Sequence, residues 1–549
     1  MSSSSGRVRP DERRLLIGLG VAASIVLAAV LRTARPTADR PSPADQEPSA
    51  IAADPAFEVY ERTDFGAVEE ARNVTVQADG MIVACGASGD DILDSHAAHD
   101  IALARYGPDG QLDPSFGVGG KVVVDLGAHS EVAEGVVALP DGHLLVAGSI
   151  SGDHLGSADG DDFFVARFNV DGSLDRGFGK QGVAALDLGR SDDHAVAIAV
   201  QPDGAIVVAG SRRPGRGALQ PGLARFTADG AVDIGFGVDG VFQSSFQRDT
   251  YLADVVVDSD GSLLLALNTG EYAYPWWDGA VARVNAKGAL DPTFGRDGIA
   301  VVPLARSGRG NSRATSVLTT SDGKVLIAGS TDSDAFRGSD ILLTRFSGSG
   351  QLDPTFGAGP ITLIEIATNS HDSLSDMVKD ASGRLLLVSR SSKDIGWKSQ
   401  GLGFALRQAD GSADLSFGSN GTGTAWLPFP VGATDFVEAA AILHDGRGVV
   451  VGTHYEDVGQ PRINDFMLGI LPLPAVPPVS PAPSATAQAT ATPTAVALPG
   501  TPPGGATATT TAAPPTTLTP DSTAVPTREQ TPAASNPPGR VWLPWLQNP

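Results

Sequence analysis

The sequence predicts an all-β protein, a seven-bladed β-propeller in which each blade is a four-stranded antiparallel sheet. Two alternating series of turn glycines predict it, because each glycine separates two short apolar strands. The first series follows Asp or Ser at intervals of 57 to 63 residues, at Gly80, Gly142, Gly204, Gly261, Gly323, Gly383 and Gly446. The second series lies about thirty residues later in each repeat, at Gly110, Gly172, Gly230, Gly288, Gly350 and Gly411.

The last repeat predicts how the ring closes. A four-stranded unit of this length cannot bury both faces alone, so the units must stack, and a closed ring leaves no uncovered end sheet. The seventh repeat contains three strands, near residues 439–443, 449–451 and 466–471, before it runs into proline. A spare strand at Phe57 to Tyr60 precedes the first complete repeat, and we expect it to complete the last blade. The alternative is an open solenoid with exposed terminal sheets.

A short motif follows the third strand of most repeats. It reads Leu-Asp-Pro-Ser/Thr-Phe-Gly at residues 112–117, 290–295 and 352–357, with degenerate copies at 175–178, 233–236 and 414–417. Together with the Asp-Gly hairpins, this motif resembles the bacterial delta-60 repeat over roughly residues 57–473. The resemblance implies a propeller of exported or surface proteins whose functions are largely unassigned. It implies no catalytic residues.

An arginine ends the third strand of six repeats, and an aspartate follows seven or eight residues later. The pairs are Arg105 with Asp113, Arg167 with Asp175, Arg225 with Asp233, Arg283 with Asp291, Arg345 with Asp353, and Arg407 with Asp414. We expect each pair to lock its own outer hairpin, because a catalytic carboxylate is needed once and not six times. The repeat phenylalanines are expected to pack between blades. The seventh repeat has Ile470 in place of the arginine.

The two ends of the chain predict a membrane tether and a tail. The predicted organisation is a basic cytoplasmic segment (1–14), a transmembrane signal-anchor helix (15–31), a disordered spacer (32–56), the propeller (57–473), a disordered Pro/Thr/Ala-rich linker (474–540) and a short aromatic tag (541–549). The apolar run is uncharged and lacks a clean cleavage site, which favours an anchor with the propeller outside the membrane. A cleaved signal peptide and a secreted protein are the alternative.

Composition narrows the function classes. The 63 acidic and 39 basic side chains give a net charge of −24, so no nucleic-acid partner is expected. The single cysteine, Cys85, excludes an intramolecular disulfide and a thiolate metal cluster. No nucleophile elbow, phosphate-binding loop or His-Glu-x-x-His is present. We therefore expect a monomeric propeller without a catalytic site.

The irregular loops between strands two and three offer candidate binding residues. Four aromatic residues suited to stacking on a sugar or a peptide, Tyr272, Tyr274, Trp276 and Trp277, lie in one loop, and the preceding blade offers Arg212 and Arg213. The alternative is an aromatic loop folded over the blade edge. A metal could bind Asp94, His96, His99 and Asp100. Calcium is the one cofactor the acidic loops suggest, and simple solvation is its alternative.

These features predict an exported, membrane-tethered binding or scaffold module of the cell surface, with a glycan or a protein as partner. One alternative is an extracellular lyase or hydrolase with its site at the central channel. His129, His194 and His371 precede the innermost strands of their blades and are candidates for that site. A structural spacer of the cell envelope is the other alternative.

Overall fold

The computed structural model describes the repeat region of the chain. The described residues are 57–89, 98–127, 130–151, 160–189, 193–214, 217–242, 246–271, 274–303, 312–334, 338–368, 370–393, 400–418, 421–429, 433–456 and 463–475. The predicted anchor (15–31), the spacer before residue 57 and the segments after residue 475 lie outside them. Within these ranges, no helix has the length and apolarity needed to cross a membrane.

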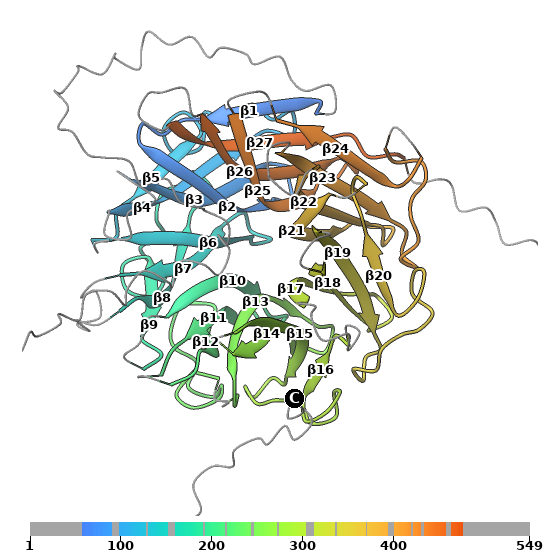
Figure 1. Ribbon diagram of the computed structural model, residues 1–549. Helices are drawn as coiled ribbons and strands as arrows, with labels where there is room; N and C mark the ends of the chain where they lie inside the picture. Colours follow the sequence, from blue (N-terminus) through green and yellow to red (C-terminus); the bar gives the residue numbers. More distant parts are fainter. Residues whose placement is uncertain are drawn as a thin grey trace, which may run out of the picture. The chain divides into compact units, whose positions relative to one another are not determined.

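The described residues form seven antiparallel sheets, numbered here as blades 1 to 7 (Figure 1). Blade 1 contains β2 (Val68–Val76), β3 (Ile82–Gly89), β4 (His99–Tyr106) and β5 (Lys121–Val124); blade 2 contains β6 (Glu131–Ala138), β7 (Leu144–Ile150), β8 (Asp162–Phe168) and β9 (Val183–Leu186); blade 3 contains β10 (His194–Val200), β11 (Ile206–Arg212) and β12 (Gln220–Phe226). Blade 4 contains β13 (Asp249–Val257), β14 (Leu263–Glu271), β15 (Tyr274–Val284) and β16 (Ile299–Val301); blade 5 contains β17 (Ser312–Thr319), β18 (Val325–Asp334), β19 (Gly338–Phe346) and β20 (Ile361–Ile364). Blade 6 contains β21 (His371–Lys379), β22 (Leu385–Ser392), β23 (Gln400–Arg407) and β24 (Thr424–Pro428); blade 7 contains β25 (Ala433–Ile442), β26 (Gly448–Glu456), β27 (Ile463–Leu471) and β1 (Val59–Thr63).

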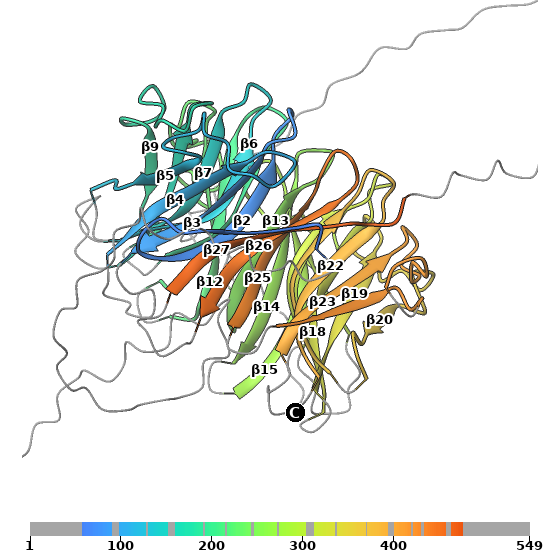
Figure 2. The same cartoon turned by 90° about the horizontal axis from the view of Figure 1, so that it is seen from above.

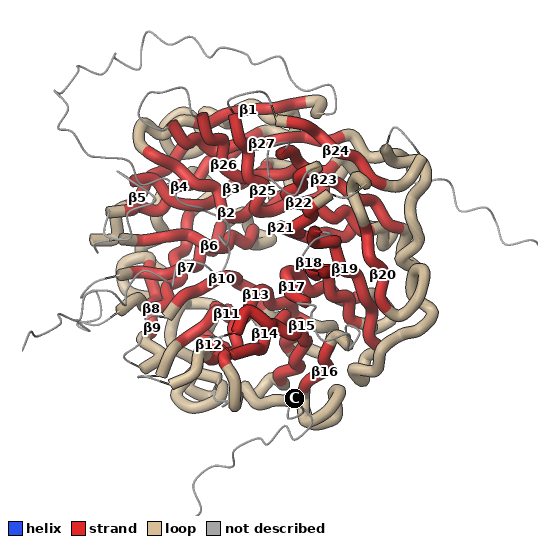
Figure 3. Tube along the Cα trace, viewed as in Figure 1, coloured by secondary structure: helices blue, strands red, loops and turns tan. Residues whose placement is uncertain are grey.

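The predicted all-β architecture of seven blades is confirmed. Figures 1 and 3 show the sheets arranged around a common axis, with the first strand of each repeat innermost, and Figure 2 shows the same ring turned by 90°. The described residues contain strands, turns and loops but no α-helix. In blade 3 the fourth strand is reduced to a single bridge between Ala224 and Val241.

The first strand of the described residues lies in the last blade. β1 pairs antiparallel with β27, with Val59 opposite Ile470 and Thr63 opposite Phe466. The strand begins two residues later than the segment expected from the sequence. Phe57, just before it, packs on Gly469: a Cβ there would lie 2.5 Å from the Phe57 ring. The same ring meets Phe404 of blade 6 edge-on, with 6.1 Å between centroids.

The hydrophobic core lies between neighbouring blades rather than inside each one. Phe116 of blade 1 is fully buried in a cluster with Val146 and Phe164 of blade 2. Phe236 of blade 3 is buried in the same way with Leu265 of blade 4. Each repeat phenylalanine therefore fills the space between its own blade and the next, and burying a large aromatic ring stabilises this contact by roughly 1.5–3 kcal/mol.

Candidate functional site

The repeat arginines join blades to one another. In blade 1, Arg105 forms an ion pair with Asp113 at 2.7 Å and lies over the Phe116 ring, 4.6 Å from its centroid. Its Nη1 also donates to the carbonyl of Val170, in the outer turn of blade 2, at 2.6 Å. The arginine thus fixes its own hairpin and also binds the next blade. Its side chain is 6% exposed, so it is not available to a ligand.

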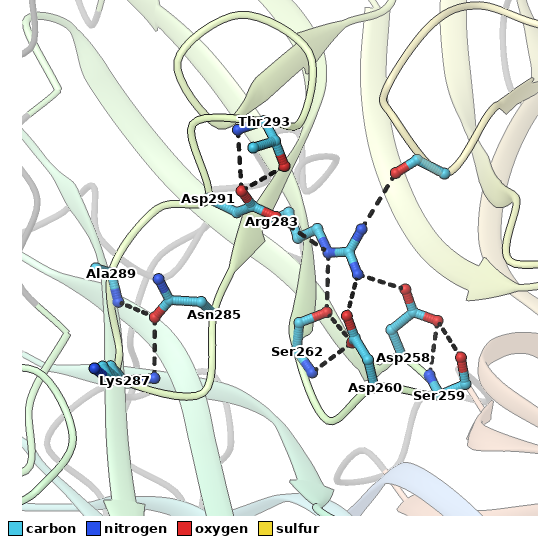
Figure 4. A network of polar contacts seen from close by, with 11 residues as sticks. Asp258, Ser259, Asp260, Ser262, Arg283, Asn285, Lys287, Ala289, Asp291 and Thr293 are labelled. Atoms are coloured by element: carbon cyan, nitrogen blue, oxygen red, sulfur yellow. Dashed lines mark hydrogen bonds and ion pairs between the residues drawn. The ribbon is translucent and has the colours of Figure 1, made fainter. Parts of the chain in front are cut away.

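The same reach across the junction recurs in four more blades. The carbonyl acceptors are Ala228 for Arg167, Ala286 for Arg225, Gly348 for Arg283 and Ala409 for Arg345. In blade 4 the carboxylate partner differs, because Arg283 lies 2.5 Å from Asp260 and 3.3 Å from Asp258 but 3.7 Å from Asp291 (Figure 4). Sequence reasoning had placed each arginine within its own hairpin and had missed the contact with the next blade.

In blade 6 the predicted pair of Arg407 and Asp414 does not form. Arg407 pairs with Leu385 in the ladder of blade 6, as Tyr106 pairs with Ile82 in blade 1. It therefore occupies the position one residue after that of the repeat arginine in blade 1, Arg105. Its Nε is buried without a hydrogen-bond partner among the described residues, and burial lowers its pKa. A shift of one residue on a strand turns the side chain to the opposite face.

At the last two junctions, after blades 6 and 7, an arginine from the first hairpin of the blade makes the contact with the next blade in place of the repeat arginine. Arg384, after the Ser-Gly turn of blade 6, lies 2.8 Å from Asp380 and 3.4 Å from Asp414, and donates to the carbonyl of Pro474. In blade 7, where Ile470 replaces the repeat arginine, Arg447 donates to the carbonyl of Pro108 in the outer turn of blade 1 at 2.8 Å. Blade 7 therefore keeps a contact of the repeat type, made from the turn of its first hairpin.

The side chains that do not repeat lie around the axis of the ring. Every innermost strand contains a β-bulge, where one residue leaves the ladder. The bulge residues, all half-buried, are Arg72, Glu134, Val196, Ala253, Thr315, Ser375 and Glu438 in blades 1 to 7. Three of them are charged, and these three belong to the consecutive blades 7, 1 and 2. We call Glu70, Arg72, Glu134, Arg390 and Glu438 the axial cluster.

The charges of the axial cluster interact across blades. Burial alone would lower the pKa of Arg72, but the carboxylates of Glu70, Glu134 and Glu438 outweigh it and raise that pKa. Arg72 pairs with Glu70, which also accepts a hydrogen bond of 3.0 Å from the Tyr455 hydroxyl. Side chains of blades 7 and 1 are therefore in contact, and the charge of Glu134 in blade 2 acts on the same arginine.

Blade 6 contributes the second cation of the axial cluster. Arg390 lies over the Phe436 ring, 4.0 Å from its centroid, and burial lowers its pKa to about 10. Three carboxyl groups and two guanidinium groups thus influence one another's charge at this end of the inner strands. This arrangement suits recognition of a charged ligand by ion pairs and hydrogen bonds.

Protonation of Glu438 should make the stability of the protein depend on pH. Burial raises its pKa to about 7 from an ordinary 4.5, although Arg72 opposes the rise. The folded state then keeps a proton that the unfolded chain loses, so stability falls as the pH rises from about 4.5 to 7. Glu438→Gln should reduce by several degrees the drop in melting temperature between about pH 5 and pH 8. Ser375→Ala, at the equivalent bulge, should leave that drop unchanged; an equal drop in all three proteins would contradict the assignment.

The predicted aromatic platform is only partly described. Tyr272 lies outside the described residues, and Tyr274 and Trp276 are described only as backbone positions of β15. The Trp277 ring packs edge-on against Tyr251 of the innermost strand, with centroids 5.0 Å apart. Trp277 is half-buried, and its ring is held against the blade.

The predicted basic residues Arg212 and Arg213 differ from each other in their surroundings. Arg212 is 8% exposed, donates to the carbonyl of Leu188 in blade 2 at 3.0 Å, and has its pKa lowered by burial. It lies inside the junction of blades 2 and 3 rather than on a binding loop. Arg213 lies 3.9 Å from Asp249 and donates to the carbonyl of Gly217.

The predicted metal site divides between the two faces of β4. Asp94 and His96 lie outside the described residues. His99 is buried, with its Nδ1 3.2 Å from the Ser130 hydroxyl, whereas Asp100 lies within 4.8 Å of carboxylate oxygens of Asp125 and Glu131. Successive residues of a strand point to opposite faces, so His99 and Asp100 do not converge on one ion.

The channel histidines occupy separate blade junctions. His129 lies outside the described residues. The Nδ1 of His194 lies 3.6 Å from Asp161, and the ring of His371 lies beside Gly338. In the described part of the chain these two histidines do not contact each other.

Comparison with known proteins supports the propeller fold. Residues 77–116, 139–178, 201–236 and 320–356 match the family described as "Domain of unknown function (DUF5122) beta-propeller". Each match runs from the first hairpin to the repeat phenylalanine. No curated protein matches the chain in sequence.

Several solved structures are similar to the chain at low identity. A glucose dehydrogenase is 10% identical over 61% of this chain and 95% of its own, with a TM-score of 0.33. The endo-arabinase of Bacteroides thetaiotaomicron is 9% identical over 62% and 93%, with a TM-score of 0.28. The WD40 domain of SCAP from fission yeast is 8% identical over 75% and 87%, with a TM-score of 0.33. Two are enzymes and one is a WD40 domain, so they leave the function undecided; the chain is a seven-bladed β-propeller with four repeats similar to a family of unknown function.

Proposed function

We propose that the protein is a binding or scaffold module that recognises a glycan or a peptide through the axial cluster. One observation carries this proposal: the charged bulge residues are confined to blades 7, 1 and 2, whereas the equivalent positions of blades 3 to 6 are uncharged. Groups that serve the fold recur in most blades, as the repeat arginines do. Charged residues that do not recur from blade to blade, at half-buried positions around the axis, are better explained by binding of a ligand than by a role in the fold.

The composition of the cluster indicates the class of ligand. Three carboxyl groups against two guanidinium groups favour a partner with a cationic group and several hydrogen-bonding groups, such as an amino sugar or a basic peptide. The net charge of −24 on the protein likewise favours a positively charged partner.

The location of the protein and its repeat class belong to the proposal as well. The uncharged segment 15–31 with arginines before it supports an uncleaved membrane anchor with the propeller outside the cell. The recurring Leu-Asp-Pro-Ser/Thr-Phe-Gly motif supports assignment to the delta-60 repeats of exported proteins. The pairing of β1 with β27 supports a ring held shut by its first strand.

A binding screen with variants of the axial cluster tests the proposal. The full-length protein is applied to immobilised amino-sugar glycans and basic peptides, and the affinity for the best probe is measured. Glu134→Gln and Glu438→Gln should each weaken it at least about tenfold, because each removes one ion-pair partner. Ser375→Ala and Thr315→Val are the matched controls at uncharged bulges and should bind as the native protein does. Equal affinity in all variants would place the site elsewhere, turnover of a probe would favour an enzyme, and no binding would favour a spacer.

A further inference from the structure

A second set of carboxylates lies where neighbouring blades meet. At the junction of blades 7 and 1, Asp64, Glu69 and Asp465 each bring an oxygen within 4.8 Å of the others. The next two junctions repeat the arrangement, with Asp100, Asp125 and Glu131 and then with Asp162, Asp187 and Asp193. Each triad takes one residue from the third strand of a blade, one from the loop after the fourth strand, and one from the start of the next blade.

The loop residue of each triad is held in the same way. One oxygen of Asp64 accepts the amide of Gly66 at 2.6 Å, and Asp125 and Asp187 accept the amides of Gly127 and Gly189 at the same distance. These glycines have φ of +99°, +87° and +126°, which only glycine adopts readily. The Asp-x-Gly turn thus fixes the carboxylate of each loop residue at its junction.

At the junction of blades 7 and 1, two buried carboxylate oxygens have no hydrogen bond. Glu69 is fully buried; its Oε1 accepts the amide of Ala67 at 2.7 Å, and its Oε2 has no partner among the described residues. Asp465 is 4% exposed; its Oδ2 is paired with Arg62 at 2.6 Å, and its Oδ1 also has no partner there. A buried polar atom without a partner is costly, and a native structure usually satisfies it with a ligand, an ion or water.

The charges around this triad are not balanced. Arg62 offsets one of the three carboxylates, while Lys121 donates to the backbone carbonyl of Asp64 at 2.7 Å. Burial, together with the charges of Asp64 and Asp465, raises the pKa of Glu69 to about 8.

We propose that Asp64, Glu69 and Asp465 bind a calcium ion at the junction of blades 7 and 1. The donors are all oxygens, which hard divalent cations prefer, and no imidazole or thiol belongs to the triads. Asp64 directly follows β1, and Asp465 lies in β27, so the ion connects the first and last strands of the propeller to blade 1. This junction is one of those that lack a repeat arginine.

Calcium binding to the full-length protein tests the proposal. Metal-free protein is dialysed against labelled calcium, and its melting temperature is recorded with and without the ion. The native protein should bind calcium saturably, and its melting temperature should rise. Glu69→Gln keeps the side-chain shape but loses the charge, so it should lose one equivalent of calcium, or bind that equivalent at least about tenfold more weakly. Asp64→Asn should do the same while keeping the oxygen that accepts the Gly66 amide.

Asp322→Asn, at a carboxylate in the first hairpin of blade 5 that is 58% exposed, is the matched control and should retain all bound calcium. Unchanged stoichiometry and affinity in both Glu69→Gln and Asp64→Asn would overturn the proposal, as would the absence of saturable binding to the native protein. Displacement of calcium by an equal concentration of magnesium would overturn the assignment to calcium.

Discussion

Arg345→Ala should destabilise the propeller by about 1–3 kcal/mol, because it breaks a mostly buried ion pair and a hydrogen bond to the next blade, while Lys324 at 3.5 Å and Thr355 remain as partners of Asp353. Arg345 lies 2.9 Å from Asp353, with both side chains 11% exposed, and lies over the Phe356 ring, 4.5 Å from its centroid. It also donates to the carbonyl of Ala409 in blade 6. Chemical denaturation of the native protein and the variant measures the loss.

Arg407→Leu is the matched control, because it removes an arginine from the end of the same strand of the next blade. Arg407 is 8% exposed, and its buried Nε lacks a partner within the described residues, so its removal should be neutral or should stabilise the protein by about 1 kcal/mol. Equal losses for both variants would show that the arginines act through packing alone and would contradict the role given to the ion pairs.

Removing β1 should have the largest effect of all. A chain that begins at Asp64 exposes the edge of β27 and loses Phe57, which packs on Gly469 and Phe404; loss of a buried Phe side chain, with the cavity it leaves, costs about 3–5 kcal/mol. We expect this chain to unfold without a cooperative transition or to associate through the free edge. Light scattering and thermal unfolding measure both outcomes. A chain that begins at Ala56 keeps β1 and is the control; identical melting of the two chains would show that β1 does not hold the ring.

The fold could be predicted because the turns carry their own sequence signal. An Asp-Gly or Ser-Gly pair between two apolar strands specifies a hairpin locally, and twelve such pairs, with Gly288 after Lys287 as a thirteenth turn, specify repeated sheets by their regular spacing. The register of Arg407 was also readable in principle. Asp414 follows it by seven residues, whereas Asp113 follows Arg105 by eight, and one residue of difference changes the face of the strand.

The functional candidates were harder to predict, because they depend on contacts between blades. The bulges that turn Arg72, Glu134 and Glu438 out of the ladder have no local sequence signature, so the axial cluster was missed. The acidic triads join residues from two blades, and their only sequence signal was the repeated Asp-x-Gly followed by Glu or Asp, as at Asp64 and Glu69. The aromatic loop and the pair of histidines were predicted as sites from residue type alone, and residue type does not determine the direction of a side chain.

The most direct test of the closed ring is a disulfide between its first and last strands. Val59 and Ile470 are directly opposite each other in the β1–β27 ladder, a separation that a disulfide spans, and Cys85 is buried and should stay reduced. In the full-length protein, Val59→Cys with Ile470→Cys should form an intramolecular bond on mild oxidation, identified by mass spectrometry. Val59→Cys with Leu471→Cys, one residue out of register, should not form it. Absence of the first crosslink, or a crosslink only between two chains, would contradict a propeller closed by its own first strand.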